Sequence, residues 1–332
     1  MSNNKTTLLE IQNLAVEFKT DDGIVKAVNG VSYDVPAGHA IGIVGESGSG
    51  KSVSQLAVMR LIARPAGRIT QGQVLFEGTD LLDLDDTEMR HIRGNRIAMI
   101  FQDPMNSLNP VYTIGKQIGE SLRLHKGLTD NEASARAVEL LDLVGIPSPE
   151  DRINDYPHQL SGGMQQRAMI AMAISCDPEL LIADEPSTAL DVTIQAQVIE
   201  LLGELRSKLN MAVILITHDL ALVAGFCDEV AVMYAGYIVE QGSARDIFYN
   251  PAHPYTLGLL KSVPSLTTSQ KDRLEAIPGA PPDMLALPAG CPYAARCSFV
   301  RDECTVSVPE LHQLNEGHTI RCIVDVKTGE LR

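Results

Sequence analysis

The chain has 332 residues, of which 45% are hydrophobic, so it can form one large domain with an appendage or two domains. Its formal net charge of −15 argues against a general nucleic-acid-binding protein, because such proteins need a basic face that displaces counterions from phosphates. No apolar run approaches the roughly 18 residues of a membrane-spanning helix, and the N-terminus lacks the apolar core of a signal peptide. We therefore expect a cytoplasmic protein that reaches a membrane only through partners.

The first 44 residues predict strands. Apolar and polar side chains alternate over residues 8–35, and the turn-forming sequences at 21–23 and 36–38 separate the runs. This pattern indicates antiparallel strands. Residues 40–44 are uniformly apolar, as in a central strand that is buried on both faces, and a glycine-rich loop follows directly.

The middle of the chain predicts an α/β fold with a parallel sheet. Residues 110–175 are mostly helical in pattern, and the spacing of Thr129 and Glu132 predicts a capping box. Two apolar strands, 180–183 and 212–217, flank an amphipathic helix over residues 194–209, and a strand–helix–strand unit of this kind forms a parallel sheet. Beyond residue 262 the periodicity weakens and prolines predict a loop-rich tail.

The loop after residue 44 carries a phosphate-binding motif. It reads G-E-S-G-S-G-K-S and fits the pattern G-x-x-x-x-G-K-[ST], in which glycines let successive backbone N–H groups face the phosphates of a nucleotide. Lys51 is expected to reach the β- and γ-phosphates, and the hydroxyl of Ser52 is expected to bind Mg²⁺. The residues predicted to line this loop are Gly45, Ser47, Gly48, Ser49, Gly50, Lys51 and Ser52.

Three further segments carry candidate catalytic groups. The strand 180–183 delivers Asp184 to a sheet edge, where it can organise Mg²⁺, and Glu185 comes next, placed to polarise the attacking water. His218 ends the next buried strand in the position of a γ-phosphate sensor, because an imidazole can donate to an anion. Gln102 lies where strands give way to helices and is expected to sense Mg²⁺ or the attacking water. Any one of these four side chains could have only a structural role. Their occurrence in one chain together with Lys51 favours an ATPase site.

A second glycine-rich segment, L-S-G-G-M-Q-Q at 160–166, opens a helix. Ser161 is a good N-cap residue, and Gly162 and Gly163 expose the amides of the helix start to an approaching anion. An ordinary capped helix is the alternative. The position of this segment between Gln102 and Asp184 argues against that alternative.

The order of these motifs closely resembles that of the ATP-binding subunits of ABC transporters, over nearly the whole chain. The resemblance implies that two ATPase subunits close on shared ATP, with Ser161 and Gly163 contacting the γ-phosphate held by the partner's P-loop. It also implies that Gln102 couples to the membrane subunits and that Asp191 lies at the interface between the two ATPases. Phe18 falls where the family places an aromatic residue against adenine, although a core strand residue is an equal alternative.

The tail resembles that of the dipeptide and oligopeptide importers in this family, as do residues 101–110 and 156–160. Its four cysteines have the spacing C-x5-C-x6-C-x17-C, unlike the paired C-x2-C rhythm of structural zinc sites. Four thiolates suit a [4Fe–4S] cluster or Zn²⁺, and the importer family includes members with such a cluster, so we favour the cluster over zinc and zinc over free thiols. The cysteines are Cys291, Cys297, Cys304 and Cys322. Cys176 and Cys227 are expected to be buried core residues.

These expectations define an ATPase domain over residues 1–261, with a helical subdomain at about 103–175, and a C-terminal extension over residues 262–332. The resemblance implies ATP and Mg²⁺ as ligands, a paralogous second ATPase, two transmembrane permease subunits and an extracytoplasmic solute-binding protein. It places the chain on the cytoplasmic face of the inner membrane, with a dipeptide, oligopeptide, nickel ion or oligosaccharide as the imported solute. The alternatives are a soluble ABC ATPase without transport function, a regulatory subunit that does not hydrolyse ATP, and an exporter subunit.

Overall fold

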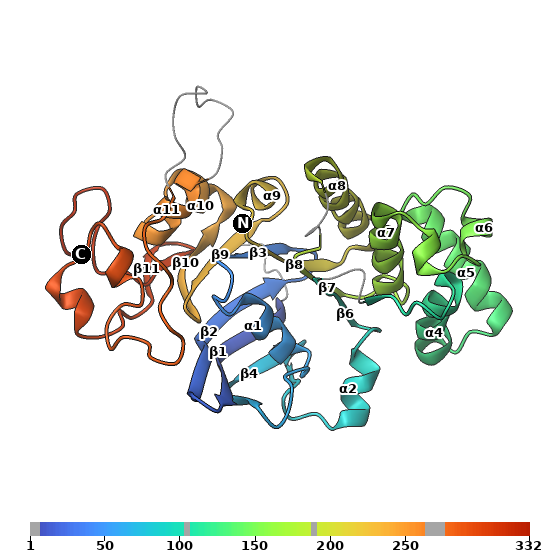
Figure 1. Ribbon diagram of the computed structural model, residues 1–332, viewed down its shortest axis with the longest axis horizontal. Helices are drawn as coiled ribbons and strands as arrows, with labels where there is room; N and C mark the ends of the chain where they lie inside the picture. The colour runs from blue at the N-terminus through green and yellow to red at the C-terminus, as the bar shows by residue number, and fades with distance from the viewer. Residues whose placement is uncertain (1–6, 103–106, 187–190, 263–275) are drawn as a thin grey trace. The chain divides into compact units, whose positions relative to one another are not determined.

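The computed structural model describes residues 7–102, 107–186, 191–262 and 276–332 (Figure 1). The chain forms two compact units, each assembled from segments that are distant in the sequence. The P-loop unit contains residues 7–35, 40–82 and 217–332. The helical unit contains residues 36–39 and 83–216.

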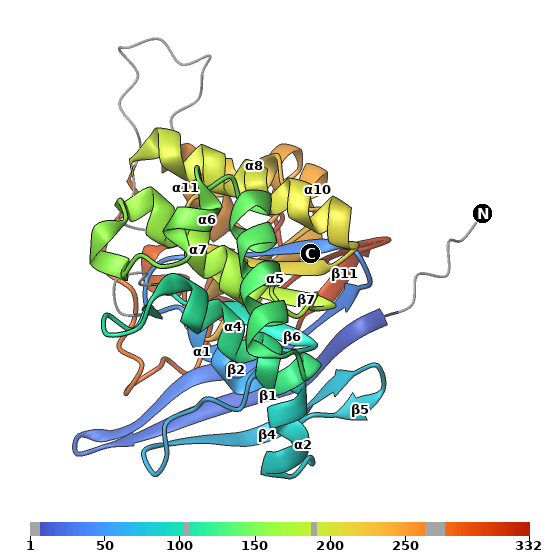
Figure 2. The ribbon, with the colours of Figure 1, turned by 90° about the vertical axis from the view of Figure 1, so that its right-hand side faces the viewer.

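An antiparallel sheet forms one layer of the P-loop unit. Its strand order is β2-β1-β4-β5, and β1 pairs antiparallel with β4 (Figure 2). The apolar side chains that alternate along β1, such as Leu9 and Val16, are fully buried, which confirms the predicted strand pattern. The strands are β1 Thr7–Thr20, β2 Gly23–Pro36, β4 Gly67–Phe76 and β5 Thr79–Asp80.

The second sheet segment of the P-loop unit begins at β3, all five residues of which are buried as predicted. β3 pairs parallel with β9, and β9, β10, β12 and β11 then follow in antiparallel pairs. The strands are β3 Ala40–Val44, β9 Glu229–Tyr234, β10 Tyr237–Ser243, β11 His312–Asn315 and β12 His318–Ile320. The helices are α1 Lys51–Val58, α9 Leu220–Ala224, α10 Ala244–Tyr249 and α11 Pro254–Ser262.

The helical unit holds three parallel strands in the order β6-β7-β8. Its crossover helix α8 connects β7 to β8, which confirms the predicted strand–helix–strand unit. The strands are β6 Ile97–Ile100, β7 Leu180–Asp184 and β8 Ala212–Thr217. The helices are α2 Asp86–Ile92, α4 Ile114–Lys126, α5 Asp130–Leu143, α6 Pro149–Arg152, α7 Gly162–Ala173 and α8 Val192–Leu209.

Helices α4, α5 and α7 pack against one another in the helical unit (Figure 1). Helix α5 begins with the predicted capping box: the Glu132 N–H donates to Thr129 Oγ1 at 3.4 Å, and the Thr129 N–H donates to Glu132 Oε2 at 2.9 Å. The Ala133 and Leu140 side chains of α5 are fully buried. The local sequence therefore fixes where this helix starts and which face it buries.

A buried carboxylate joins the C-terminal hairpin of β11 and β12 to the rest of the P-loop unit. Glu240 in β10 is 0% exposed and accepts hydrogen bonds from the backbone N–H groups of Ala252 and His253, at 2.7 and 2.9 Å. The Nε2 atom of His318 in β12 lies 2.9 Å from Glu240 Oε1. The tail, for which the sequence predicts mainly loops, thus contributes two strands that extend a sheet.

Candidate active site

The glycine-rich loop leaves β3 and ends at the start of α1. Gly45, Gly48 and Gly50 have φ angles of 155°, 77° and 99°, in the region where an L side chain is strained. A Cβ atom on Gly45 would lie 2.2 Å from the carbonyl oxygen of Met233. The loop therefore needs glycine at this position for close approach of the backbone as well as for its conformation.

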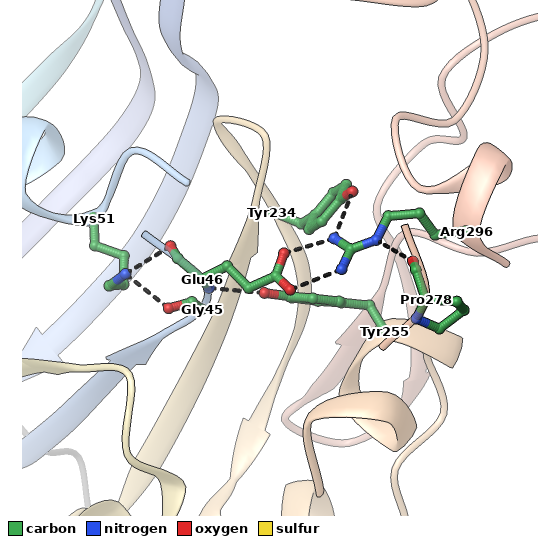
Figure 3. Close-up of polar contacts among 7 residues, drawn as sticks. All are labelled: Gly45, Glu46, Lys51, Tyr234, Tyr255, Pro278 and Arg296. Carbon is green, nitrogen blue, oxygen red and sulfur yellow. Dashed lines mark hydrogen bonds and ion pairs between the residues drawn. The ribbon is translucent and has the colours of Figure 1, made fainter. Parts of the chain in front are cut away.

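Lys51 is the first residue of α1 and is only 5% exposed. Its Nζ atom donates to the carbonyl oxygens of Gly45 and Glu46, at 2.8 and 2.9 Å (Figure 3). The ammonium group is thus held over the loop, beside the backbone that curls around it. Ser52 follows in the first turn of the same helix.

Glu185 occupies an unusual backbone conformation at the end of β7. Asp184, the last residue of the strand, is 5% exposed, and Glu185 has a positive φ of 45°. The Glu185 N–H donates to the carbonyl oxygen of Ile216 in the neighbouring strand β8. Non-glycine residues in this region are uncommon and concentrate at functional sites, and here the conformation turns the chain sharply beyond the strand.

Gln102 follows β6 and contacts Glu185 directly. The Gln102 Nε2 atom donates to Glu185 Oε2 at 3.0 Å. The two residues are 83 positions apart, and the parallel pairing of β6 with β7 brings their strand ends to the same edge. The structure therefore joins two of the predicted catalytic side chains, through a contact that the sequence did not indicate.

The glycine-rich helix start has the predicted cap. Ser161 is the N-cap of α7 and its Oγ accepts from the Met164 N–H at 3.3 Å, while Gly162 is exposed. The buried Gln165 side chain donates to the carbonyl oxygens of Pro157 and Leu160, which anchors the preceding turn. The cap and the Gln165 contacts thus fix the start of the helix, at which Gly162 is exposed.

The remaining predicted residues lie as follows. Asp191 is the N-cap of α8 and accepts from the Ile194 N–H at 3.0 Å, whereas the adjoining residues 187–190, like residues 103–106, lie outside the described part of the chain. His218 is exposed after β8, and the half-buried Phe18 lies opposite Gly67 in β4. The P-loop unit contains the residues Phe18, Gly45, Ser47, Gly48, Ser49, Gly50, Lys51, Ser52 and His218. The helical unit contains Gln102, Ser161, Gly162, Gly163, Asp184, Glu185 and Asp191.

The four C-terminal cysteines line one pocket, together with Tyr293, Phe299 and several aliphatic side chains. Burial raises the pKa of Cys291 to about 12 and that of Cys297 to about 11, and the neighbouring thiols add to both shifts. Burial also raises the pKa of Cys322. Within the described ranges, no group of three or more His, Cys, Asp or Glu side chains converges as ligands of a single metal ion. Cys176 and Cys227 are buried elsewhere, as expected.

The sequence analysis did not single out three residues that organise the P-loop unit, and two of these residues contact the loop itself. Arg296 pairs with Glu46 of the loop, and the Tyr255 hydroxyl accepts from the Glu46 N–H at 2.8 Å. Glu240 anchors the hairpin that follows the cysteines. The only sequence signal was the position of Arg296 beside Cys297.

Comparison with known proteins assigns the class. A family model described as "ABC transporter" matches residues 28–188. The solved dimeric structure of MJ0796, described as a bacterial ABC transporter cassette, superposes with a TM-score of 0.64 at 28% identity, covering 71% of this chain and 99% of that one. The fold is that of an ABC cassette, with an antiparallel β subdomain and a mixed sheet, and the protein is an ABC-type ATPase that hydrolyses ATP to drive transport.

Closer relatives narrow the class. A model described as "Oligopeptide/dipeptide transporter, C-terminal region" matches residues 239–304. The oligopeptide transport ATP-binding protein OppD of Bacillus subtilis is 52% identical over 95% of this chain and 88% of its own length. The dipeptide transport ATP-binding protein DppD of the same bacterium is 51% identical over 97% and 96%. The chain therefore belongs to the ATP-binding subunits of oligopeptide/dipeptide ABC importers, the ATPases that energise peptide uptake.

No helix in the described ranges is both long enough and apolar enough to cross a bilayer.

Proposed function

We propose that the chain binds ATP and Mg²⁺ through its P-loop and hydrolyses ATP with Glu185 as the group that polarises the attacking water. The hydrogen bond of 3.0 Å between Gln102 and Glu185 supports this assignment. It orients the Glu185 carboxylate at the end of a strand, beside the Gln102 amide that is expected to sense Mg²⁺ or the attacking water. Lys51 contacts the β- and γ-phosphates, and Ser52, Asp184 and Gln102 serve Mg²⁺, which neutralises charge on the phosphates. His218 senses the γ-phosphate, and Phe18 stacks on adenine.

We further propose that the ATPase site is completed by a second ATPase subunit, a paralogous sister of this chain. The capped start of α7 supports this assignment, because helix N-termini with outward-facing amides bind anions. Ser161, Gly162 and Gly163 contact the γ-phosphate held by the partner, and Asp191 communicates between the two sites. The related cassette MJ0796 is described as dimeric with bound ADP and phosphate.

In the cell, this ATPase pair acts on the cytoplasmic face of the inner membrane, with two permease subunits and an extracytoplasmic solute-binding protein. We propose di- or oligopeptides as the imported solute, following the relatives named OppD and DppD. The domains we propose are an ATPase domain of residues 1–261, whose helical subdomain spans about 103–175, and a C-terminal extension of residues 262–332 that follows it in the sequence.

Uptake by the purified complex in proteoliposomes tests this function. A labelled peptide is expected to accumulate only when ATP is supplied on the side of the ATPase subunits. Unlabelled dipeptides and oligopeptides should compete in the order of their affinity for the binding protein. Accumulation of nickel or an oligosaccharide, without accumulation of any peptide, would reject peptides as the substrate.

The cysteine pocket is proposed to hold a [4Fe–4S] cluster, with Zn²⁺ as the alternative ligand. The four cysteines line one pocket, and burial raises the pKa of Cys291, Cys297 and Cys322, so a bound cation would be needed to stabilise these three as thiolates. A [4Fe–4S] cluster takes one thiolate per iron, so the four cysteines that line the pocket match its number of ligands. The cluster would cross-link a region that has only a small apolar core, made of residues such as Ile320 and Val324.

Anaerobic purification tests the cluster. The full-length protein is expected to contain about four iron and four sulfide ions per chain and to absorb visible light. The variant Cys297→Ser should lose this iron, whereas Cys227→Ser, which changes a buried cysteine outside the pocket, should retain it. Stoichiometric zinc without iron would decide for the alternative, and a metal-free protein would reject both.

A further inference from the structure

The C-terminal extension contacts the phosphate-binding loop through one arginine. Arg296 donates to both carboxylate oxygens of Glu46, the second residue of the loop, at 2.6 and 2.9 Å (Figure 3). The two residues are 250 positions apart in the chain. A bidentate pair of this kind is both strong and geometrically specific.

Arg296 is held in place from all sides. Its side chain is 4% exposed, its Nε atom donates to the Pro278 carbonyl oxygen at 2.9 Å, and one terminal nitrogen lies 3.2 Å from the Tyr234 hydroxyl. Its guanidinium also lies 5.9 Å from the centre of the Tyr293 ring. Because every part of the guanidinium is engaged, the arginine acts as a rigid anchor and not as a mobile surface cation.

Glu46 connects this anchor to the lysine of the loop. Its N–H donates to the hydroxyl of the fully buried Tyr255, and its carbonyl oxygen accepts from Lys51 Nζ (Figure 3). The extension also approaches the loop at Pro281 and Pro282, which share a pocket with Glu46. A continuous set of contacts therefore runs from Arg296 through Glu46 to Lys51.

The charge of Glu46 opposes the function of the loop. A triphosphate is strongly anionic, and an unpaired carboxylate within the loop that binds it would repel it. Arg296 cancels this negative charge and draws the carboxylate toward the extension. Surface pairs contribute little, but this pair is mostly buried and belongs to a loop that is proposed to bind a highly charged ligand, so its removal should be visible in ATP binding.

We propose that Arg296 is a positioning residue of the nucleotide site: its pairing with Glu46 neutralises the carboxylate of the P-loop and holds it toward the extension, so that the C-terminal extension sets the affinity for ATP. The inference rests on the proposed binding of ATP at the P-loop. It assigns the extension a role in nucleotide binding in addition to any role of its cysteines.

Variants that remove the charge of one or both partners test the proposal in the full-length protein. Arg296→Gln is expected to raise the Kd for ATP about tenfold, since it leaves Glu46 unpaired near the phosphates. In the assembled complex, the KM for ATP should rise similarly while kcat stays near the wild-type value. The double variant Glu46→Gln with Arg296→Gln should recover most of the affinity, because no carboxylate then remains. Glu46→Gln alone should bind ATP at least as tightly as the wild type.

The controls separate this proposal from simpler explanations. Arg136→Gln removes an arginine from an Arg–Glu pair on the surface of α5 and should leave the Kd unchanged. Weakened ATP binding by Glu46→Gln, or a double variant that binds ATP as weakly as Arg296→Gln, would overturn the charge argument. Because Glu46→Gln leaves Arg296 unchanged, it tests the proposal even if the Arg296 variants fold poorly. Lys51→Ala tests the premise that ATP binds at the P-loop. If this variant binds ATP like the wild type, the proposed P-loop site is wrong. If Lys51→Ala loses ATP binding while Arg296→Gln binds ATP normally, only the role of Arg296 is rejected.

Discussion

Replacing Glu185 with glutamine is expected to lower ATP turnover by about 10²- to 10⁴-fold while leaving ATP binding intact. The amide has almost the same shape as the carboxylate, and its oxygen can still accept from Gln102 Nε2, so the geometry at the end of β7 should persist. An amide cannot accept a proton from water, however, and the ATP-bound dimer should accumulate. Phosphate release measures the first effect, and size-exclusion chromatography with ATP measures the second.

A matched control lies at the other end of the same strand. Glu179 precedes β7 and forms a bidentate pair with Arg96, so Glu179→Gln changes the same chemical group far from the catalytic edge of the strand. This variant should hydrolyse ATP at nearly the wild-type rate. Normal turnover by Glu185→Gln would show that another group activates the water.

Replacing Glu240 with alanine is expected to destabilise the P-loop unit by about 3–5 kcal/mol, because it leaves several buried polar groups without their partner. The N–H groups of Ala252 and His253 and the ring of His318 would lose their acceptor in a region that water does not reach. The melting temperature should fall by on the order of 10 °C. Amide exchange should quicken first in β12, where His318 joins the hairpin to β10.

Two further variants serve as controls for the effect of Glu240→Ala on the melting temperature. Glu316→Ala removes an exposed carboxylate from the turn between β11 and β12 and should change the melting temperature very little. His318→Gln keeps a hydrogen-bond donor for Glu240 and should be less destabilising than Glu240→Ala. Equal melting temperatures for Glu240→Ala and Glu316→Ala would show that the buried carboxylate contributes nothing.

Elements specified by neighbouring residues could be predicted from the sequence. The uniformly apolar strands β3 and β7, the helix α8 between two parallel strands and the Thr129–Glu132 capping box all follow from local patterns. The strands β11 and β12 could not be predicted, because they are only four and three residues long and polar in part. These residues form strands because β12 pairs with the edge of β10, β11 pairs with β12, and Glu240 in β10 contacts the side chain of His318 in β12.

The candidate site divides in the same way. The P-loop and the N-cap at Ser161 are each specified by a motif of consecutive residues, so their local geometry could be predicted. The contact of Gln102 with Glu185 and the pairing of Arg296 with Glu46 are tertiary contacts. The first requires the ends of two strands to lie side by side, and the second joins residues that are 250 positions apart, so neither follows from a local motif. Glu46 also occupies a variable position of the P-loop pattern, so nothing in the motif drew attention to it.

The pairing of Glu46 with Arg296 also has a consequence for biosynthesis. A ribosome that adds about 5–20 residues per second synthesises Glu46 roughly 10–50 seconds before Arg296, given their separation of 250 positions. Until then the nascent P-loop carries a negative charge without its partner, and under our proposal it binds ATP weakly. A newly made subunit would thus acquire its full affinity for ATP only when its last segment has emerged and folded back.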